Sequence, residues 1–168
     1  MADLSVTITE SVTLNGKARG NTISKTISGI NNTIEKLVTC LANNDTTILK
    51  TGPTGHTSDG EVHVDDIKYL RVTNLATNAA HKVNLSLQID DAEHASNASS
   101  GQDVCNLLLE AGHSFIMGST ADAIVVDDDG ATPVDIATGA GGLNDLESIL
   151  INESIGNNVQ IELFVATA

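Results

Sequence analysis

The stretch Ile67-Lys68-Tyr69-Leu70-Arg71-Val72-Thr73, followed after a polar span by Val83 to Ile89, carries the clearest structural signal in the chain. The first run is rich in β-branched and aromatic residues, which favour strands. The second run alternates aliphatic with polar residues, so its aliphatic side chains fall on one face of a pleated strand. The two runs predict an antiparallel pair of strands over a hydrophobic core, with the other strands of the chain packed against that pair.

Similar short runs, separated by turn-forming residues, continue to both ends of the chain. Leu4 to Leu14 has an aliphatic residue at every second position except Glu10, and it leads to Asn15-Gly16, a strong hairpin signal. Gly112 is expected to turn the strand at 104–109 into a returning strand at 113–117. The remaining expected strands lie at 22–28, 34–41, 48–49, 62–64, 149–151 and 159–165. The last of these, 159–165, should lie inside the sheet system.

Roughly eight to ten short strands, without a long helix or an internal repeat, are typical of a sandwich or jelly roll. The predicted fold class is therefore all-β, an antiparallel β-sandwich or jelly-roll-like fold. At 168 residues the chain is long enough for one core, so residues 1–168 are predicted to form a single domain. Long polar loops are expected near 90–102 and 127–142.

The composition restricts both the core and the ligands. Hydrophobic residues make up 40% of the chain and aromatic residues only 2%, with no Trp, so Ile, Leu and Val must fill the core. Sugar-binding sandwiches and single-strand binders use exposed aromatic platforms. The aromatic residues are Tyr69, Phe115 and Phe164, and Tyr69 and Phe164 in particular fall inside expected strands, so such a platform is not expected.

The charge excludes polyanionic partners. The formal net charge is −14, from 22 acidic and 8 basic residues, which repels nucleic acid and anionic membranes. The N-terminal residues lack the basic and apolar regions of a signal peptide, and no apolar run is long enough to span a membrane. We therefore expect a soluble product of the cytoplasm. In that compartment Cys40 and Cys105 are predicted to be buried free thiols, with a disulfide as the alternative.

Residues with catalytic or metal-binding potential form no convincing set. The histidines are scattered, the adjacent pairs Asp65-Asp66 and Asp90-Asp91 would point to opposite faces of a strand, and Gly139-Ala140-Gly141-Gly142 lacks the Lys-Ser/Thr of a P-loop. Asp127, Asp128 and Asp129, followed by Gly130, are the best candidates for calcium ligands, although the acidic residue that closes an EF-hand loop is missing. The sequence therefore predicts no catalytic residue and no cofactor.

Three segments resemble small virion structural proteins of tailed phages of marine bacteria. These are Met1 to Ile30, with its Leu14-Asn15-Gly16 turn, then Lys68-Tyr69-Leu70-Arg71-Val72-Thr73-Asn74-Leu75, and the closing Ile161-Glu162-Leu163-Phe164-Val165-Ala166. The resemblance spans the start, middle and end of the chain. This chain departs from it in the long acidic span from Asp90 to Gly142. The resemblance implies a virion structural component, without fixing its place in the particle.

An acidic, aliphatic β-protein without an evident site also suits assembly. The expected function is a non-enzymatic capsid decoration or cement protein, which binds the major capsid protein from outside as a homo-trimer on the virion surface. A tail-tube, tail-fibre or head-fibre component is the alternative in the same class. A calcium- or glycan-binding β-sandwich module is the alternative from another class, and an enzyme is the third. Neither nucleic acid nor membrane is an expected partner.

Overall fold

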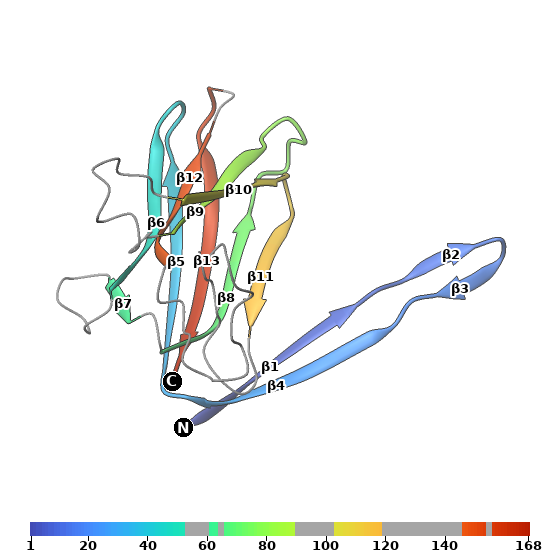
Figure 1. Cartoon of the computed structure of the whole chain (residues 1–168). Helices are drawn as coiled ribbons and strands as arrows, with labels where there is room; N and C mark the ends of the chain where they lie inside the picture. The colour runs from blue at the N-terminus through green and yellow to red at the C-terminus, as the bar shows by residue number, and fades with distance from the viewer. Residues whose placement is uncertain (53–60, 64–65, 90–102, 119–145, 154–155) are drawn as a thin grey trace.

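Two sheets packed face to face form the body of the molecule, and a long hairpin projects from it (Figure 1). The computed structural model describes residues 1–52, 61–63, 66–89, 103–118, 146–153 and 156–168. In these ranges regular structure is almost entirely β, and every strand pairing except one is antiparallel. The predicted all-β sandwich is confirmed. The expected loops at 90–102 and 127–142 lie outside the described residues.

One layer is a five-stranded sheet with the order β10-β9-β12-β6-β7, called here the β12 sheet. Its strands are β6 (Asp45–Gly52), β7 (Glu61–His63), β9 (Val83–Ile89), β10 (Asp103–Leu109) and β12 (Leu146–Asn152). The other layer is a four-stranded sheet with the order β11-β8-β13-β5, called the β13 sheet. Its strands are β5 (Asn32–Cys40), β8 (Ile67–Asn74), β11 (Ser114–Gly118) and β13 (Val159–Thr167). The last strand lies between β8 and β5, as expected.

The prediction that 67–73 and 83–89 pair with each other is wrong. These runs are β8 and β9, which belong to different sheets and face each other across the core. The predicted return of 113–117 against 104–109 is wrong for the same reason, since β10 pairs with β9 while β11 pairs with β8. Alternation reports which face of a strand is buried, but it does not report which strand lies beside it.

Two connections pass from one sheet to the other at one end of the sandwich, from β8 to β9 and from β10 to β11. A buried asparagine, Asn74, holds both of them. The Asn74 side-chain amide donates to the carbonyl oxygens of His81 at 2.9 Å and Leu109 at 3.2 Å. Its backbone N–H donates to the His113 carbonyl at 3.0 Å, and its own carbonyl accepts from Gly112 at 2.9 Å. Asn74 is fully buried, so these bonds supply the partners that a buried amide requires.

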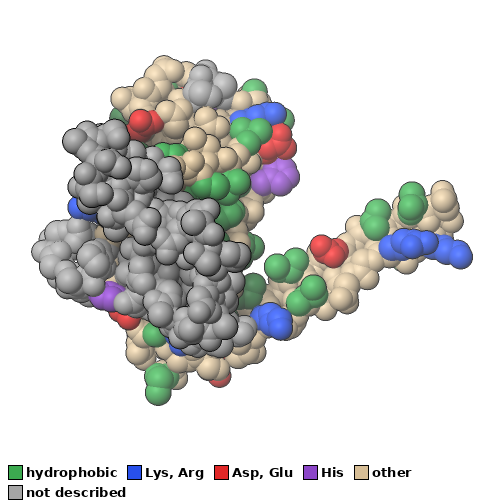
Figure 2. Space-filling view, in the orientation of Figure 1, with side chains coloured by type: hydrophobic (Ala, Val, Ile, Leu, Met, Phe, Trp, Pro, Cys, Tyr) green, Lys and Arg blue, Asp and Glu red, His purple; other side chains and the backbone are tan. Residues whose placement is uncertain are grey.

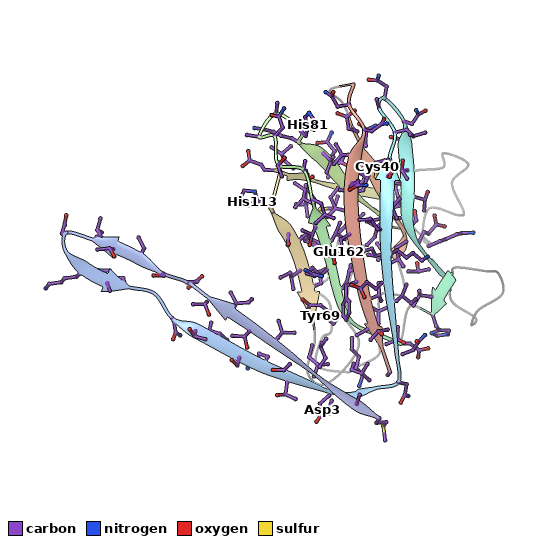
Figure 3. The ribbon with its side chains drawn as sticks, turned by 180° about the vertical axis from the view of Figure 1, so that it is seen from behind. Asp3, Cys40, Tyr69, His81, His113 and Glu162 are labelled. Atoms are coloured by element: carbon purple, nitrogen blue, oxygen red, sulfur yellow. The ribbon has the colours of Figure 1, made fainter. Side chains whose placement is uncertain are left out.

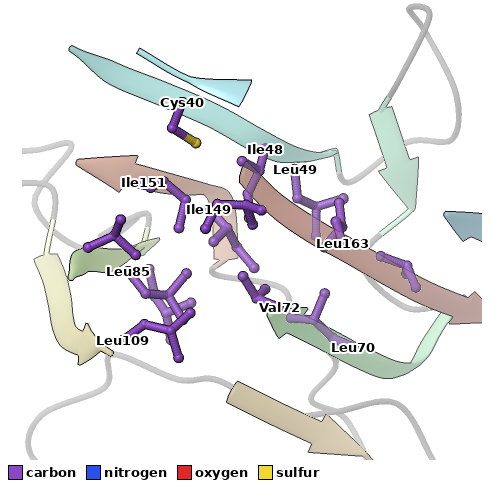
Figure 4. Close-up of a cluster of buried hydrophobic side chains, with 14 of the residues drawn as sticks. Cys40, Ile48, Leu49, Leu70, Val72, Leu85, Leu109, Ile149, Ile151 and Leu163 are labelled. Atoms are coloured by element: carbon purple, nitrogen blue, oxygen red, sulfur yellow. The ribbon is translucent and has the colours of Figure 1, made fainter. Parts of the chain in front are cut away.

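The core lies between the two sheets and is almost entirely aliphatic (Figure 4). The inward residues of β13, which are Val159, Ile161, Leu163 and Val165, are at most 1% exposed. Glu153 is also fully buried, and its Oε2 accepts the backbone N–H groups of Gly156 at 3.0 Å and Asn157 at 3.1 Å. That carboxylate therefore fixes the approach to the last strand.

The first 30 residues lie outside both sheets. They form a hairpin, called here the arm, from β1 (Ala2–Thr9) paired with β4 (Thr22–Ile30) and β2 (Val12–Leu14) paired with β3 (Lys17–Arg19). At its tip Asn15 and Gly16 have φ of 51° and 74°, as a type I′ turn requires. The predicted hairpin is thus confirmed, but only the base of its strands packs against the sandwich, over Tyr69 of β8, and the distal part projects away from it.

The two cysteines differ in environment. Cys40 is buried in the core, and burial raises the pKa of its thiol, against an opposing effect of a hydrogen bond with Thr46. Cys105 is exposed, which contradicts the prediction that both thiols are buried. Its strand β10 lies at one edge of the β12 sheet. Both are free, so the alternative of a disulfide is not realised in this structure.

Candidate interaction surface

The arm has two chemically different faces. Its strands keep one register, in which Leu4 pairs with Ile27, Ile8 with Ile23 and Leu14 with Lys17. Side chains opposite each other lie on the same side of a ribbon. One side, called the aliphatic face, therefore carries Leu4, Val6, Ile8, Val12, Leu14, Ile23 and Ile27, together with Lys17, Arg19 and Lys25.

The opposite side of the arm is built from small hydroxyl residues and is called the hydroxyl face. It carries Ser5, Thr7, Thr9, Thr13, Thr22, Ser24 and Thr26. Cross-strand hydroxyl contacts occur on it, between Thr7 and Ser24 at 3.0 Å and from Thr22 to Thr9 at 3.3 Å. These hydroxyl groups can form hydrogen bonds with one another and with water. The aliphatic side chains, by contrast, are stabilised only when another apolar surface covers them.

The base of the aliphatic face already has such a partner. Leu4, Val6 and Ile27 pack over Tyr69, Phe164 and Ala166, which lie on the outer side of the β13 sheet. The rings of Tyr69 and Phe164 meet edge to face, with centroids 5.9 Å apart and planes at 71°. Burial raises the pKa of Tyr69, although the positive charge of Arg71 opposes this effect. The base of the arm is thus anchored to the sandwich.

The distal part of the aliphatic face is uncovered. Ile8 is 48% exposed, Ile23 49%, Val12 56% and Leu14 56%. Figure 2 shows hydrophobic side chains along the projecting arm, with Lys and Arg side chains near its end. A hairpin on its own is marginally stable in water, and exposed aliphatic groups of this kind are typical of a binding surface.

The arm also differs in charge from the rest of the molecule. It contains Lys17, Arg19 and Lys25 against Asp3 and Glu10, which gives residues 1–30 a formal charge of +1. The whole chain carries −14, so residues 31–168 carry −15. The aliphatic face is therefore a locally cationic surface on an acidic protein.

A second uncovered surface adjoins the base of the arm on the outer side of the β13 sheet. Across its strands Glu35, Phe164, Arg71 and Ile116 lie in one row, and Leu37 lies opposite Glu162 in the next. Leu37 is 63% exposed and Ile116 41%. An ion pair between Arg71 and Glu162, at 2.9 Å, lies on the same side of the sheet. Figure 3 views this side, with Tyr69 and Glu162 on the sheet and Asp3 on the arm.

Most of the residues singled out from the sequence for chemistry lie in parts of the chain that the structure does not describe. Asp127, Asp128, Asp129 and Gly139 to Gly142 lie outside the described residues, as do Asp65, Asp90 and Asp91. Among the residues that are described, no group of three or more His, Cys, Asp or Glu side chains could hold a metal ion.

Two described histidines make only local contacts. The Nε2 atom of His81 lies 3.4 Å from the Asn78 amide, and the Nδ1 atom of His113 lies 3.1 Å from the Ala111 carbonyl. Close by, Lys82 pairs with Glu110 at 3.0 Å, and this hydrogen bond and charge lower the pKa of Glu110.

The projection of residues 1–30 from the sandwich as an arm was not predicted from the sequence. A signal was present, because the first 30 residues combine alternating aliphatic positions with small Ser and Thr residues at the alternate positions. Within the described ranges, no helix is long and apolar enough to cross a membrane. Comparisons of the chain with protein-family models, with curated proteins and with solved structures find no match.

Proposed function

We propose that this chain is a non-enzymatic structural protein of a phage virion, and that it decorates the capsid with its arm as a docking element. The observation that carries the proposal is the arm, a projecting hairpin with aliphatic side chains about half exposed at its distal end. The sequence resemblance to virion proteins gives the assembly in which it would act, with the major capsid protein as a partner.

Adhesion by such an arm needs no chemistry. Burying a fully exposed aliphatic side chain stabilises a complex by about 1.5–3 kcal/mol. The distal aliphatic residues of the arm are about half exposed before docking, so each of them gains only part of this energy. Several of them acting together can hold a protein on a capsid, where each added contact opposes the separation of subunits. The acidic body, at −15, faces solvent and keeps the decorated particle soluble.

The experiment is binding of the recombinant chain to DNA-emptied heads of the phage that encodes it, measured by co-sedimentation. The variant Ile8→Asp/Ile23→Asp places charge on the aliphatic face, and Thr7→Asp/Ser24→Asp places the same charge on the hydroxyl face one residue away. We expect the first variant to lose binding and the second to retain it. Deletion of residues 4–14 should also abolish binding.

Two results would overturn this proposal. Mass spectrometry of purified particles could show that the chain is not part of the virion, or both double variants could bind heads as the native chain does. Labelling confined to tails in electron micrographs would replace the capsid role with that of a tail component.

A further inference from the structure

We infer that the partner of the arm is a second copy of this chain. The distal aliphatic face of one arm docks on the outer side of the β13 sheet of a neighbouring copy, over the uncovered surface around Leu37, Phe164 and Ile116. This inference rests on the proposed function in that it takes the arm to be a docking element. It adds the identity of the surface that receives it.

The arm itself requires a partner. Its base is held by the cluster of Ile27, Ile30, Tyr69 and Ala166, but the part from Ile8 to Ile23 has no second layer in the described structure. Hairpins without a second layer are marginally stable, and the four distal aliphatic residues at 48–56% exposure lose favourable burial energy while they remain in water. A docked partner supplies both the order and the burial.

The outer side of the β13 sheet is the best-supported receiving surface because the arm already binds it within one chain. Ile27 lies against Tyr69 and Gly118 there, since a Cβ built on Gly118 would lie 3.2 Å from the Tyr69 ring and 3.6 Å from Ile27. Beyond Phe164 the same side of the sheet carries the uncovered residues Leu37 and Ile116, which flank the Arg71–Glu162 ion pair. A second arm on this surface extends an interface that exists in every copy.

Charge favours the same pairing. The arm contributes Lys17, Arg19 and Lys25 at exposed positions. The receiving surface contributes Glu35 and also Glu162, which is paired with Arg71 at 2.9 Å, on a body of charge −15. Opposite charges of this kind steer association and select the partner, while the aliphatic contacts supply most of the affinity. The arms of two copies, by contrast, are both cationic and repel each other.

Packing on the face of the sheet is also favoured over strand addition at its β5 edge. The edge strand β5 places Lys36 on its inward side, between Ile34 and Val38, which both pack against the core. A charged residue pointing inward from an edge strand is a recognised obstacle to edge-to-edge pairing. The arm therefore has a suitable face to bind, and the β5 edge is unsuitable for it.

Each copy offers one arm and one receiving surface. Two copies can exchange arms reciprocally, or several can pass their arms around a closed ring, and in both cases every arm is used. The mass of the particle in solution decides the number of copies, and either closed form satisfies the inference.

The first test measures the mass of the purified full-length chain by size-exclusion chromatography with light scattering over a range of concentrations. We expect a dimer or a closed ring. Ile8→Asp/Ile23→Asp and Leu37→Asp/Ile116→Asp, which place charge on the two halves of the contact, should each weaken association roughly tenfold or more. Thr7→Asp/Ser24→Asp, on the hydroxyl face, is the matched control and should associate normally. A native monomer at all concentrations would overturn the inference.

A second test identifies the contact without relying on a folding-sensitive substitution. In a Cys105→Ser background, chains with Leu14→Cys are mixed with chains with Leu37→Cys and treated with a short bismaleimide. We expect covalent heterodimers, and far fewer when Thr13→Cys, on the hydroxyl face, replaces Leu14→Cys. Equal yields from both arm positions, or none from either, would exclude this docking.

The inference and the proposed function can fail separately. A monomer in solution that still binds emptied heads through its aliphatic face would refute the copy-to-copy contact and leave the virion role intact. An arm-dependent oligomer that binds no head would do the reverse.

Discussion

The arm and the sandwich are built from strands with the same alternating pattern, yet only the sandwich has a core. In β13 the alternate residues Val159, Ile161, Leu163 and Val165 are at most 1% exposed, because the β12 sheet covers them. In the arm the corresponding aliphatic residues become more exposed with distance from the sandwich, up to 56% at Leu14. Pattern alone therefore does not bury a strand, which also needs a second layer.

The side chains on the opposite face of these strands also differ between the sandwich and the arm. On β8 and β13 the outward positions include Tyr69, Phe164 and Ala166, which gain a cover from the base of the arm. On the arm the positions of the hydroxyl face are Ser and Thr in β1 and β4 from Ser5 to Thr9 and from Thr22 to Thr26, so that face is suited to water. The arm can therefore take up one further layer, and only on its aliphatic face.

The largest expected effect contrasts one core residue with one arm residue. Leu163→Ala removes a fully buried side chain from the central strand of the β13 sheet and should lower the free energy of unfolding by about 2–5 kcal/mol. Ile8→Ala, at a residue 48% exposed, should change it by about 0.5 kcal/mol or less in the monomer. Urea denaturation of dilute protein measures both. Equal losses would mean that the distal arm unfolds together with the core.

A smaller effect should be confined to the arm. Gly20 has φ of +135°, and a Cβ at this position would lie only 2.1 Å from the backbone oxygen of Glu10. Gly20→Ala should therefore open the neighbouring Glu10–Asn21 hydrogen bond, with a local cost above the roughly 1–2 kcal/mol of a left-handed residue. Hydrogen exchange should show faster exchange of arm amides, with the urea midpoint of the sandwich unchanged.

Gly16→Ala is the matched control for that change. Gly16 also has a positive φ, of +74°, but its Cβ would meet nothing within 4 Å. Its cost should therefore be roughly that of the left-handed conformation alone, about 1 kcal/mol, and its exchange should rise less than that of Gly20→Ala. If both variants left the arm amides unchanged, the arm would be stabilised by more than its hairpin register.

Sequence reasoning identified the strands of this protein better than their neighbours. The alternation at Val83 to Ile89, the Asn15-Gly16 turn and the alternating run at Val159 to Val165 are local signals, and the structure has each of them. The assignment of β8 and β9 to one sheet was wrong, because the span between them crosses from one sheet to the other and is held there by Asn74. That bond is a tertiary contact which no local period encodes.

The candidate interaction surface was harder to predict from the sequence than the strands. Whether Leu4 to Leu14 packs inside a sheet system or projects from it depends on the chain near Gly29, where φ is +80°, and on the bond from Asn31 N–H to the Thr167 carbonyl, which ties the end of the arm to the last strand. The exposure of Cys105 has a similar origin, since it depends on β10 being an edge strand. Strand order decides both, and alternation does not specify it.

The smallest expected effect is a shift in one titration, and it locates the boundary between arm and sandwich. Tyr69 is the single tyrosine in a chain without tryptophan, so its tyrosinate absorbance reports on this site alone. Burial beneath the base of the arm raises the pKa of Tyr69. Ile27→Ala, which removes a side chain packed on that ring, should lower this pKa toward the ordinary tyrosine value of about 10. Spectrophotometric titration measures the shift.

The sign of the accompanying pH effect follows from the raised pKa. Because the docked base of the arm favours neutral Tyr69, the stabilisation from this group is fully present below about pH 10, and it is lost as the pH rises through the raised value. Ile8→Ala, on the same aliphatic face but in its exposed distal part, is the control and should leave the titration of Tyr69 unchanged. If Ile8→Ala lowered the pKa as much as Ile27→Ala, the distal arm would contribute to the cover over Tyr69, and the boundary between anchored and free arm would lie beyond Ile8.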